Sequence, residues 1–313
     1  MNWTMLPNLK NLRAWIELSR PPFQIVGVLP FLLGAELAWF FTGTFRWDIF
    51  AWGTFGVVLV MLATYYAGEF WDFIGDSLSR DYHNNPFAGG TKVLQQGLVS
   101  RNASLWASLG CVVVALCVGI ILQFGYHTGI WTIPLGIVGL TGGFFYSTQP
   151  VRWVARGVGE LWIAFCYGWL PIAVSFYLQT GYLVPLITVM AIPVGLTCFN
   201  LIMINEFPDY PADIQVEKAN IVVRLGRERA ARLYGFTSGA SWIVVLASVY
   251  FGVPLQGLLL YAFVFGLSLT LNIAMMRGRW QDPGTLEKLC AGTYLVNLGT
   301  TAAYLLAFIR VII

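Results

Sequence analysis

The sequence predicts an all-α, polytopic membrane protein with nine transmembrane helices, arranged as two similar four-helix halves plus a ninth helix. Of the 313 residues, 58% are hydrophobic and only 11% are charged, whereas a soluble domain carries about 25% charged residues. So few charged side chains cannot cover a water-soluble globule of this size. The composition excludes a soluble cytosolic enzyme, a disordered protein and a nucleic-acid-binding protein.

The predicted helices follow from apolar segments, because a helix that spans the bilayer needs about 20 mostly apolar residues. Nine segments meet this requirement: 22–41, 49–71, 104–124, 128–147, 159–179, 183–204, 232–252, 254–276 and 289–312. We interpret 1–313 as a single membrane domain. Its parts are an amphipathic lead-in at 1–21, a first half at 22–147, a second half at 148–276 and the ninth helix within 277–313.

The boundaries of these elements rest on turn residues and on polarity. The lead-in is polar and mildly basic with apolar residues at helical spacing, which is typical of a helix that lies in the membrane interface. The third and fourth helices are joined by a short turn around Gly125, and the seventh and eighth meet at Gly252 and Pro254. Short connections of this kind predict antiparallel neighbours.

The distribution of Lys and Arg predicts the orientation. Sixteen of the 18 lie in the N-terminal segment or in the connections after helices 2, 4, 6 and 8, and only Arg46 and Arg310 lie on the other side. By the positive-inside rule, the N-terminus is cytoplasmic and the C-terminus is on the outer side of the cell membrane. Adding or removing one helix would break this alternation, so the asymmetry favours nine.

Two windows repeat one acidic pattern, E-x-x-D-x-x-x-D. The residues are Glu69, Asp72 and Asp76 in the first window and Glu206, Asp209 and Asp213 in the second. Positions i, i+3 and i+7 of a helix lie on one face, so each window predicts a stripe of carboxylates at the cytoplasmic end of an apolar helix. Like charges this close repel each other unless a cation neutralises them. Oxygen ligands favour Mg²⁺ shared with substrate phosphates, and two stripes suit two ions around one diphosphate.

An acidic, solvated helix end is the alternative interpretation of either window alone. Two windows with identical spacing, 137 residues apart, favour a shared site. The repeat also indicates that helices 1–4 and 5–8 were built alike, with the site at their interface.

Basic residues lie near both windows in the sequence. Lys92 follows a Gly-Gly-Thr run at 89–91, whose backbone N–H groups can approach a phosphate. Lys218 and Arg224 follow the second window, and Arg152 lies between the two halves. We interpret Lys92, Lys218 and Arg224 as diphosphate contacts or, alternatively, as charges that only hold their loops on the cytoplasmic side.

Several motifs resemble those of the UbiA superfamily of intramembrane aromatic prenyltransferases over nearly the full length of the chain. Residues 68–76 read GEFWDFIGD where the family has N-D-x-x-D-x-x-x-D, and 205–213 read NEFPDYPAD where it has D/N-x-x-x-D-x-x-x-D. The stretch KANIVVRLG at 218–226 is similar to K-x-T-L-x-V-R-L-G. Residues 146–181 resemble the family's Y-[ST]…G-[LV]-G-[ED]…G…Q segment, and Arg20-Pro21 is also typical.

Within the superfamily, the chain most resembles the branch that prenylates 1,4-dihydroxy-2-naphthoate in menaquinone biosynthesis. The loop GGTKVLQQGLVS, the GWL turn of the fifth helix and the VRLG tail carry this resemblance. The chain departs from the family pattern at Gly68, Glu69 and Asn220, where the family has Asn, Asp and Thr.

The resemblance implies Mg²⁺-dependent transfer of a polyprenyl group from polyprenyl diphosphate to an aromatic acceptor, with release of diphosphate. The implied ligands of two Mg²⁺ ions are Glu69, Asp72, Asp76, Glu206, Asp209 and Asp213. The implied substrate-binding residues are Arg20, Lys92, Arg152, Asn205, Lys218 and Arg224. The implied catalytic residues are Asp72, Asp76, Lys92, Tyr146, Glu160, Asp209 and Asp213.

Structural roles are the alternative for two groups of residues, the trio Tyr146, Arg152 and Glu160 and the aromatic side chains. Tyr146, Arg152 and Glu160 would orient or deprotonate the acceptor, but helix-end packing and topology would also explain them. The many aromatic residues (22 Phe, 14 Tyr, 13 Trp) suit a site that forms an allylic carbocation, because aromatic faces stabilise cations; core packing is the alternative. The prenyl tail is expected to leave the site toward lipid.

Other functions stay open at this point. A cation or proton transporter also keeps carboxylates inside its membrane helices, but usually near the bilayer midplane, and Glu36 is the acid that most favours it. An alcohol phosphatidyltransferase shares acidic helical motifs, but its D-x-x-D-G-x-x-A-R pattern is absent. Within the superfamily, 4-hydroxybenzoate, homogentisate and a glyceryl phosphate are the alternative acceptors.

Overall fold

The computed structural model describes residues 7–82 and 85–309, and in them every regular element is a helix. The main helices are α1 (Pro7–Leu18), α2 (Pro21–Thr42), α3 (Trp47–Trp71), α4 (Phe73–Tyr82), α5 (Arg101–Ile120), α6 (Thr132–Phe144), α7 (Gly159–Tyr167), α8 (Trp169–Thr180), α9 (Pro185–Gln215), α10 (Ile221–Leu225), α11 (Arg227–Ser248), α12 (Leu255–Met276) and α13 (Pro283–Phe308). The predicted all-α class is confirmed. Arg310, one of the two bases expected on the outer side, lies outside the described residues.

Eight helical segments of the described chain are long and apolar enough to cross a membrane. They are α2, α3, α5 with the π turn that follows it, α7 with α8, α9, α11, α12 and α13. The protein is therefore a multi-pass membrane protein. The predicted count of nine is not confirmed, because the segment expected at 128–147 forms only α6, with 13 residues. At 1.5 Å per residue α6 is about 20 Å long, shorter than the ~30 Å hydrocarbon core.

Two predicted helices differ in shape from the expectation. The fifth is broken between α7 and α8 at Gly168, where a Cβ would lie 2.6 Å from the Cα of Gly195 in α9. Glycine at 168 therefore lets α9 approach the break closely. The sixth does not end near 204 but continues as α9 to Gln215, through Pro208 and Pro211. Much of the expected loop after it is thus helical.

Only one of the two acidic windows lies on a single helix. The second lies within α9, as expected of a stripe on one helix face. The first does not lie on one straight helix, because α3 ends at Trp71 and α4 begins at Phe73. Asp72 occupies the bend with φ −88° and ψ 4°. The turn still continues through it, since its N–H donates to the carbonyl of Gly68 at 2.8 Å.

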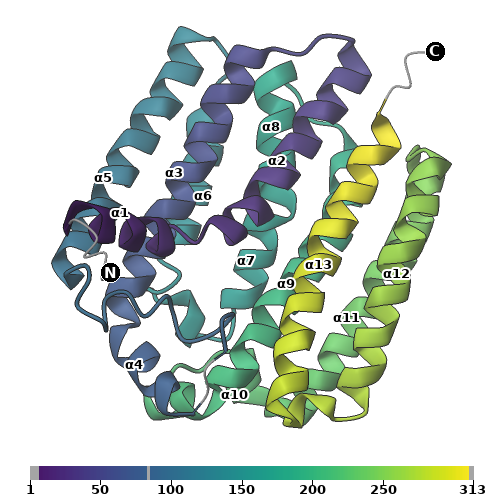
Figure 1. Ribbon diagram of the computed structural model, residues 1–313. Coiled ribbons are helices and arrows are strands. Elements are labelled where there is room, and N and C mark those ends of the chain that lie inside the picture. The colour runs from purple at the N-terminus through teal and green to yellow at the C-terminus, as the bar shows by residue number, and fades with distance from the viewer. Residues whose placement is uncertain (1–6, 83–84, 310–313) are drawn as a thin grey trace, which may run out of the picture.

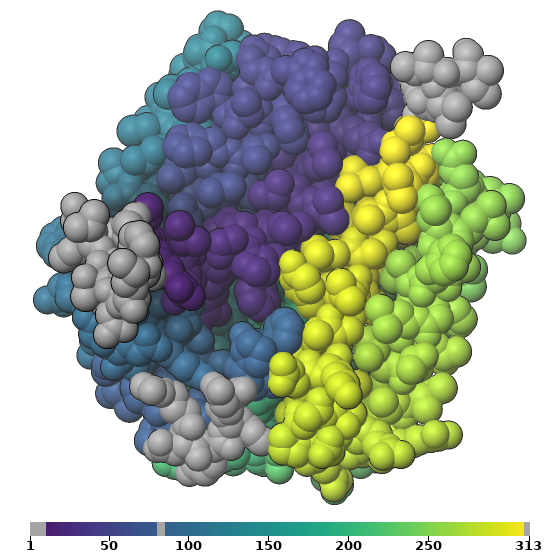
Figure 2. Space-filling view, viewed as in Figure 1, coloured from purple at the N-terminus to yellow at the C-terminus, as the bar shows by residue number. Residues whose placement is uncertain are grey.

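The helices pack as one bundle (Figure 1), and one large buried apolar cluster lies between α2, α8, α9, α11, α12 and α13. The largest buried side chains there include Phe176, Ile187 and Met190. α1 lies across the bundle, and α4 and α10 lie at the same end of it (Figure 1). α12 and α13 run side by side along one edge, visible in green and yellow in Figure 2. This arrangement brings the ends of α3 and α9 to the same end of the bundle.

Candidate active site

Both acidic windows line a single cavity of about 200 Å³ at this end of the bundle. The predicted site residues that line it are Arg20, Glu69, Asp72, Asp76, Tyr146, Asn205, Glu206, Asp209, Asp213 and Lys218. They come from the start of α2, from α3 and α4, from α9 and from the connections that follow α6 and α9. Residues about 140 positions apart in the sequence thus face one volume.

Two carboxylates of the first window, Glu69 and Asp72, are held by a base together with a backbone N–H or a hydroxyl. Glu69 is buried and accepts hydrogen bonds at Oε1 from the Arg20 guanidinium (2.8 Å) and from the backbone N–H of Thr91 (2.9 Å). Asp72 accepts a short hydrogen bond from the Ser147 hydroxyl. The guanidinium of Arg152 lies 3.6 Å from Oδ1 of Asp72. The bend at Asp72 therefore faces the connection that follows α6.

Asp209 and Asp213 of the second window are held by the segments next to them in space. Asp209 accepts a hydrogen bond from the backbone N–H of Gly89 (3.0 Å). Asp213 accepts one from the side-chain amide of Asn220 (2.7 Å), and the ammonium of Lys218 lies 3.7 Å from its other oxygen. Asn220 is buried and also caps α10, because its Oδ1 accepts from the N–H of Val223 (2.8 Å).

The segment 89–91 connects the two windows. The N–H of Gly89 binds Asp209 of the second window, and the N–H of Thr91 binds Glu69 of the first. Between them, Gly90 has φ +65°, and a Cβ at this position would lie 2.3 Å from Oδ2 of Asp76. The sequence predicted that these N–H groups approach a phosphate. In the structure the N–H groups of residues 89 and 91 bind carboxylates instead.

Charge in the cavity is only partly balanced by the protein. Burial, followed by the nearby charges of Glu69 and Asp72, raises the pKa of Asp76 well above its usual range. Burial by itself would lower the pKa of Lys218, but the carboxylates of Asp213 and Asp72 outweigh burial and raise it. Lys218 therefore stays protonated, while the acids favour any additional cation that enters.

Several buried oxygens of the site have no hydrogen-bond partner. They include Oε2 of Glu69, Oδ1 of Asn205 and both carboxylate oxygens of Glu206. Such groups are costly unless a donor or a cation satisfies them. Within the described residues, no three Asp, Glu, His or Cys side chains meet closely enough to form a closed metal centre. An oxygen-only donor set that is completed by water and phosphate oxygens fits Mg²⁺.

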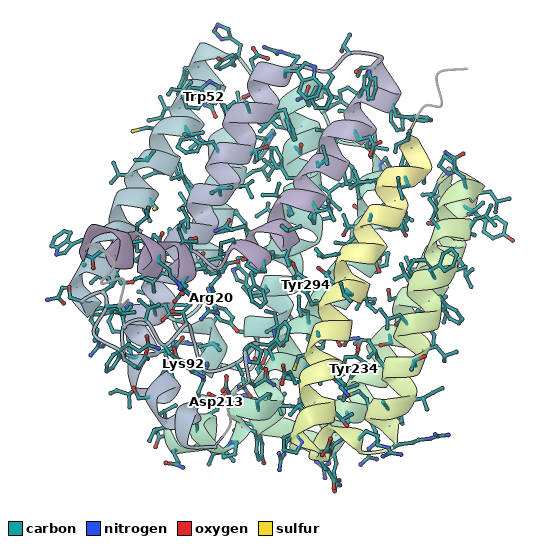
Figure 3. All side chains as sticks on the ribbon, viewed as in Figure 1. Arg20, Trp52, Lys92, Asp213, Tyr234 and Tyr294 are labelled. Atoms are coloured by element: carbon teal, nitrogen blue, oxygen red, sulfur yellow. The ribbon has the colours of Figure 1, made fainter. Side chains whose placement is uncertain are left out.

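Within the described chain, four of the predicted site residues do not line this cavity. Arg152 reaches the site through its ion pair with Asp72. Lys92 follows the 89–91 segment with φ 64°, and Figure 3 shows it between Arg20 and Asp213 in that view. Glu160 is buried and accepts a hydrogen bond from the N–H of Ile221 (2.6 Å).

Arg224, the fourth, is exposed and does not join the site. Its Nε donates to the carbonyl of Ala219 at 2.7 Å. A Cβ at Gly157 would lie 2.3 Å from the same nitrogen, so the guanidinium packs on that glycine. In this position Arg224 fixes the connection before α10 against the one before α7.

Sequence reasoning missed the residues that link distant elements. Ser147 binds Asp72, and the hydroxyl groups of Tyr65 and Tyr167 form a hydrogen bond of 3.3 Å on the cavity wall. The Tyr-Ser pair at 146–147 was visible as part of a motif, but nothing in its spacing indicated which carboxylate it meets. Tyr65 and Tyr167 were not distinguished from the many other aromatic residues of the chain.

Comparison with known families gives one match over most of the chain. Residues 27–304 match the UbiA prenyltransferase family.

The curated relatives are distant but extend over most of the chain. The 1,4-dihydroxy-2-naphthoate octaprenyltransferase of Escherichia coli (strain K12) is 25% identical over 91% of this chain and 93% of its own length. The enzyme of the same name from Bacillus subtilis (strain 168) is 22% identical over 93% of this chain and 90% of its own length. The 2-carboxy-1,4-naphthoquinone phytyltransferase of Synechocystis is 22% identical over 80% of this chain and 78% of its own length.

Solved structures show the same fold. A UbiA homolog from Aeropyrum pernix K1 superposes with a TM-score of 0.67 at 15% identity, over 89% of this chain and 95% of that one. A UbiA homolog from Archaeoglobus fulgidus bound to GPP and Mg²⁺ superposes with a TM-score of 0.62 at 14% identity, over 93% of this chain and 99% of that one.

Proposed function

This chain belongs to the UbiA prenyltransferase family, and we propose that it transfers a polyprenyl group from polyprenyl diphosphate to 1,4-dihydroxy-2-naphthoate with the help of Mg²⁺. The observation that carries the proposal is the meeting of both acidic windows in one cavity with Arg20 and Lys218. Carboxylates and bases around one volume suit a metal-bound diphosphate. The uneven distribution of Lys and Arg supports a site on the cytoplasmic side of the cell membrane.

The residues that would hold Mg²⁺ are the carboxylates of the two windows, with Asn205 as a neutral donor. The unpartnered oxygens of Glu69, Asn205 and Glu206 support this choice. Mg²⁺, when bound, neutralises charge that grows on the diphosphate as it departs. Because the windows face each other across the cavity, we propose one ion for each window.

Bases of the site would receive the departing diphosphate. Breaking the C–O bond leaves the electron pair on a diphosphate oxygen, and cations placed near that oxygen lower the barrier. Lys218 lines the cavity and is kept protonated by Asp213 and Asp72. Arg152 lies beside Asp72, and Lys92 is close in sequence to the segment that joins the windows. We assign Lys218 and Arg152 the larger part of this task.

Aromatic rings would shield the allylic carbon from water. Tyr65 and Tyr167 form a hydrogen-bonded pair on the cavity wall, and the Arg20 guanidinium lies 5.9 Å from the Tyr65 ring centre. A ring carbon of the acceptor would then form the new C–C bond to the allylic carbon and lose the substituent it carried, either a proton or a carboxyl group released as CO₂, so that the ring regains its aromaticity. Burial and the charges of Glu206 and Glu160 raise the pKa of Tyr146, so its hydroxyl stays protonated and can orient the acceptor by donating a hydrogen bond.

Glu160 would act indirectly. Its Oε1 accepts from the N–H of Ile221 at the start of α10, in the same turn that Asn220 caps. Asn220 in turn holds Asp213. We therefore propose that Glu160 positions the segment 218–221 and, through it, Lys218 and Asp213.

The choice of acceptor is supported by the relatives. Two of them are named 1,4-dihydroxy-2-naphthoate octaprenyltransferases, and a third is named for a carboxy-naphthoquinone. All three match 80–93% of this chain, at 22–25% identity.

An acceptor panel tests the proposal. Purified protein with Mg²⁺ and a polyprenyl diphosphate series is offered 1,4-dihydroxy-2-naphthoate, 4-hydroxybenzoate, homogentisate or a glyceryl phosphate, and the prenylated product is identified by mass spectrometry. We expect diphosphate release and product with the naphthoate. Preference for another acceptor would contradict the acceptor assignment. If no acceptor in the panel leads to diphosphate release, the proposed reaction is contradicted.

A further inference from the structure

A separate cavity of about 600 Å³ lies beside the second acidic window. Its lining in the described chain comes from Tyr210 of α9, the turn 225–226, the start of α11 and Trp280 between α12 and α13. Tyr210 directly follows Asp209, which lines the carboxylate-rich cavity of the candidate active site, here called the polar cavity. The described residues that line the separate cavity do not line the polar cavity. The proposed reaction therefore leaves this feature unexplained.

Three arginines converge on the separate cavity. They are Arg227, Arg229 and Arg232, all from the first two turns of α11. In the part of the chain that the structure describes, none of them forms an ion pair. The carboxylate of Glu228 also lines the cavity and would repel an anion, but the three bases outnumber it. The positive-inside rule explains the sign of these charges, but it does not require them to face one cavity.

Arg227 is held in place by two aromatic rings. The carbon of its guanidinium lies 5.1 Å from the centre of the Tyr210 ring and 5.2 Å from that of the Trp280 ring. Trp280 is itself buried and packs edge-on against Phe207, with 5.5 Å between the ring centres. A guanidinium stacked in this way presents the N–H groups at its edge, which match the oxygens of a phosphate. The cavity therefore contains a positioned donor for a phosphate.

The exposed face of α11 continues from the arginines into the membrane. Arg232, Phe236 and Ile243 share this face at positions i, i+4 and i+11. Phe236 is 74% exposed and Ile243 is 68% exposed. From Arg232 to Ile243 the face is about 16 Å long at the helical rise, close to half of the ~30 Å hydrocarbon core. A phospholipid with its phosphate at the arginines would thus lay an acyl chain on this face within one leaflet.

We propose that this cavity binds the head group of an anionic phospholipid, with the phosphate at Arg227, Arg229 and Arg232 and an acyl chain along the exposed face of α11. Charge complementarity favours an anionic lipid over a zwitterionic one, because the ammonium of a zwitterionic head group would lie beside the same arginines. The adjoining apolar face favours a lipid over a free phosphate, which would gain nothing from that face. The proposal does not depend on the reaction proposed for the polar cavity.

Two charges of the site can be removed without touching the stacked Arg227. Arg229→Gln combined with Arg232→Gln removes the two arginines that are exposed. Arg277→Gln combined with Lys288→Gln is the matched control. Both of these bases are exposed, at the end of α12 and in the first turns of α13, and neither lines the cavity. Each double variant loses two positive charges, so an effect of net charge alone would be equal in the two.

Lipid binding is measured by native mass spectrometry of the purified protein in non-ionic detergent. The protein is titrated with phosphatidylglycerol or with phosphatidylcholine that has the same acyl chains. For the tightest site of the wild type we expect about tenfold or more preference for phosphatidylglycerol, and a loss of about tenfold or more in that affinity in the Arg229/Arg232 variant. The control variant should keep the wild-type affinity. Equal affinity of the wild type for both lipids, or equal losses in both variants, would overturn the proposal.

A competition experiment separates a lipid from a free anion. Inorganic phosphate is added to the wild-type protein that has bound phosphatidylglycerol, at the same concentration as the lipid. We expect the lipid to stay bound, because phosphate cannot use the apolar face of α11. Displacement of the lipid would assign the arginines to a free anion and contradict the proposal.

A cross-linking measurement covers the case in which the Arg229/Arg232 variant does not fold. Phosphatidylglycerol with a photoreactive group on its acyl chain, close to the glycerol, is cross-linked to the wild-type protein in phosphatidylcholine vesicles. We expect label on residues 227–243 of α11 or on 279–281, in excess over a phosphatidylcholine probe of the same design. Label spread over the lipid-facing helices without this excess would contradict the proposal.

Discussion

The guanidinium of Arg20 and the carboxylate of Glu69 form an ion pair, with 2.8 Å between Nη2 and Oε1. The pair ties the beginning of α2 to the last turn of α3. The Glu69 side chain is 1% exposed and that of Arg20 is 32% exposed. The same Glu69 oxygen also binds the N–H of Thr91. One carboxylate thus joins three segments at the edge of the polar cavity.

Replacing Glu69 by Gln should destabilise the protein. The amide cannot pair with the charge of Arg20, and breaking a pair with one buried member costs about 1–3 kcal/mol after allowance for the exposure of its partner. We expect a lower melting temperature of the purified protein and a higher Mg²⁺ requirement. Glu17→Gln is the control, because the Arg13–Glu17 pair (3.0 Å) is exposed. Equal melting temperatures for the two variants would contradict the prediction.

Replacing Gly90 by Ala should impair turnover more than replacing Gly97 by Ala. Both glycines have positive φ (65° and 71°), so each substitution costs about 1 kcal/mol of backbone strain. Only at Gly90 does the new methyl group meet Asp76, whereas a Cβ at Gly97 has no atom within 4 Å. We expect kcat to fall about tenfold or more for Gly90→Ala alone. Similar kcat values for the two variants would show that backbone strain is the whole effect.

Replacing Asp72 or Asp209 by Ala should abolish turnover. Each carboxylate lines the polar cavity, and the loss of a charge that holds the metal and diphosphate is expected to lower kcat about 100-fold or more. Chelation of Mg²⁺ should have the same effect on the wild type, and added Mg²⁺ should reverse it. The exposed Glu228, changed to Gln, is the control. Activity retained in both alanine variants would remove the metal assignment.

Replacing Asn220 by Ala should reduce turnover by about tenfold, because it frees Asp213 from its amide donor. The substitution also removes the cap of α10. Ser100→Ala serves as the control: it removes the cap of α5, where Ser100 accepts from the N–H of Ala103 at 3.2 Å. Asn220→Thr should lose less turnover than Asn220→Ala, because the threonine hydroxyl can still cap α10. If Asn220→Ala keeps wild-type kcat, Asn220 acts only as a cap.

Local patterns were enough to predict most of the fold. Apolar segments of about 20 residues marked all eight segments of the described chain that can cross a membrane, and the acidic spacing marked both windows. The sequence could not show that the segment at 128–147 shortens to α6, because its apolar composition matches that of a spanning helix. It also could not show the bend at Asp72, since the E-x-x-D-x-x-x-D spacing is the same in a straight helix and in a bent one.

The sequence by itself determined the membrane class, which follows from composition, and the acidic residues of the site, which follow from local spacing. The prenyltransferase family followed from motifs that resemble those of the family. Only the tertiary structure decided which groups meet: Arg20 with Glu69, Ser147 with Asp72, and Gly89 with Asp209. It also decided that Arg224 turns away from the site and that three arginines of α11 converge on a separate cavity. The reason is physical: hydrogen bonds and cavities between helices depend on how the helices pack, and residues far apart in sequence carry no local signal of that packing.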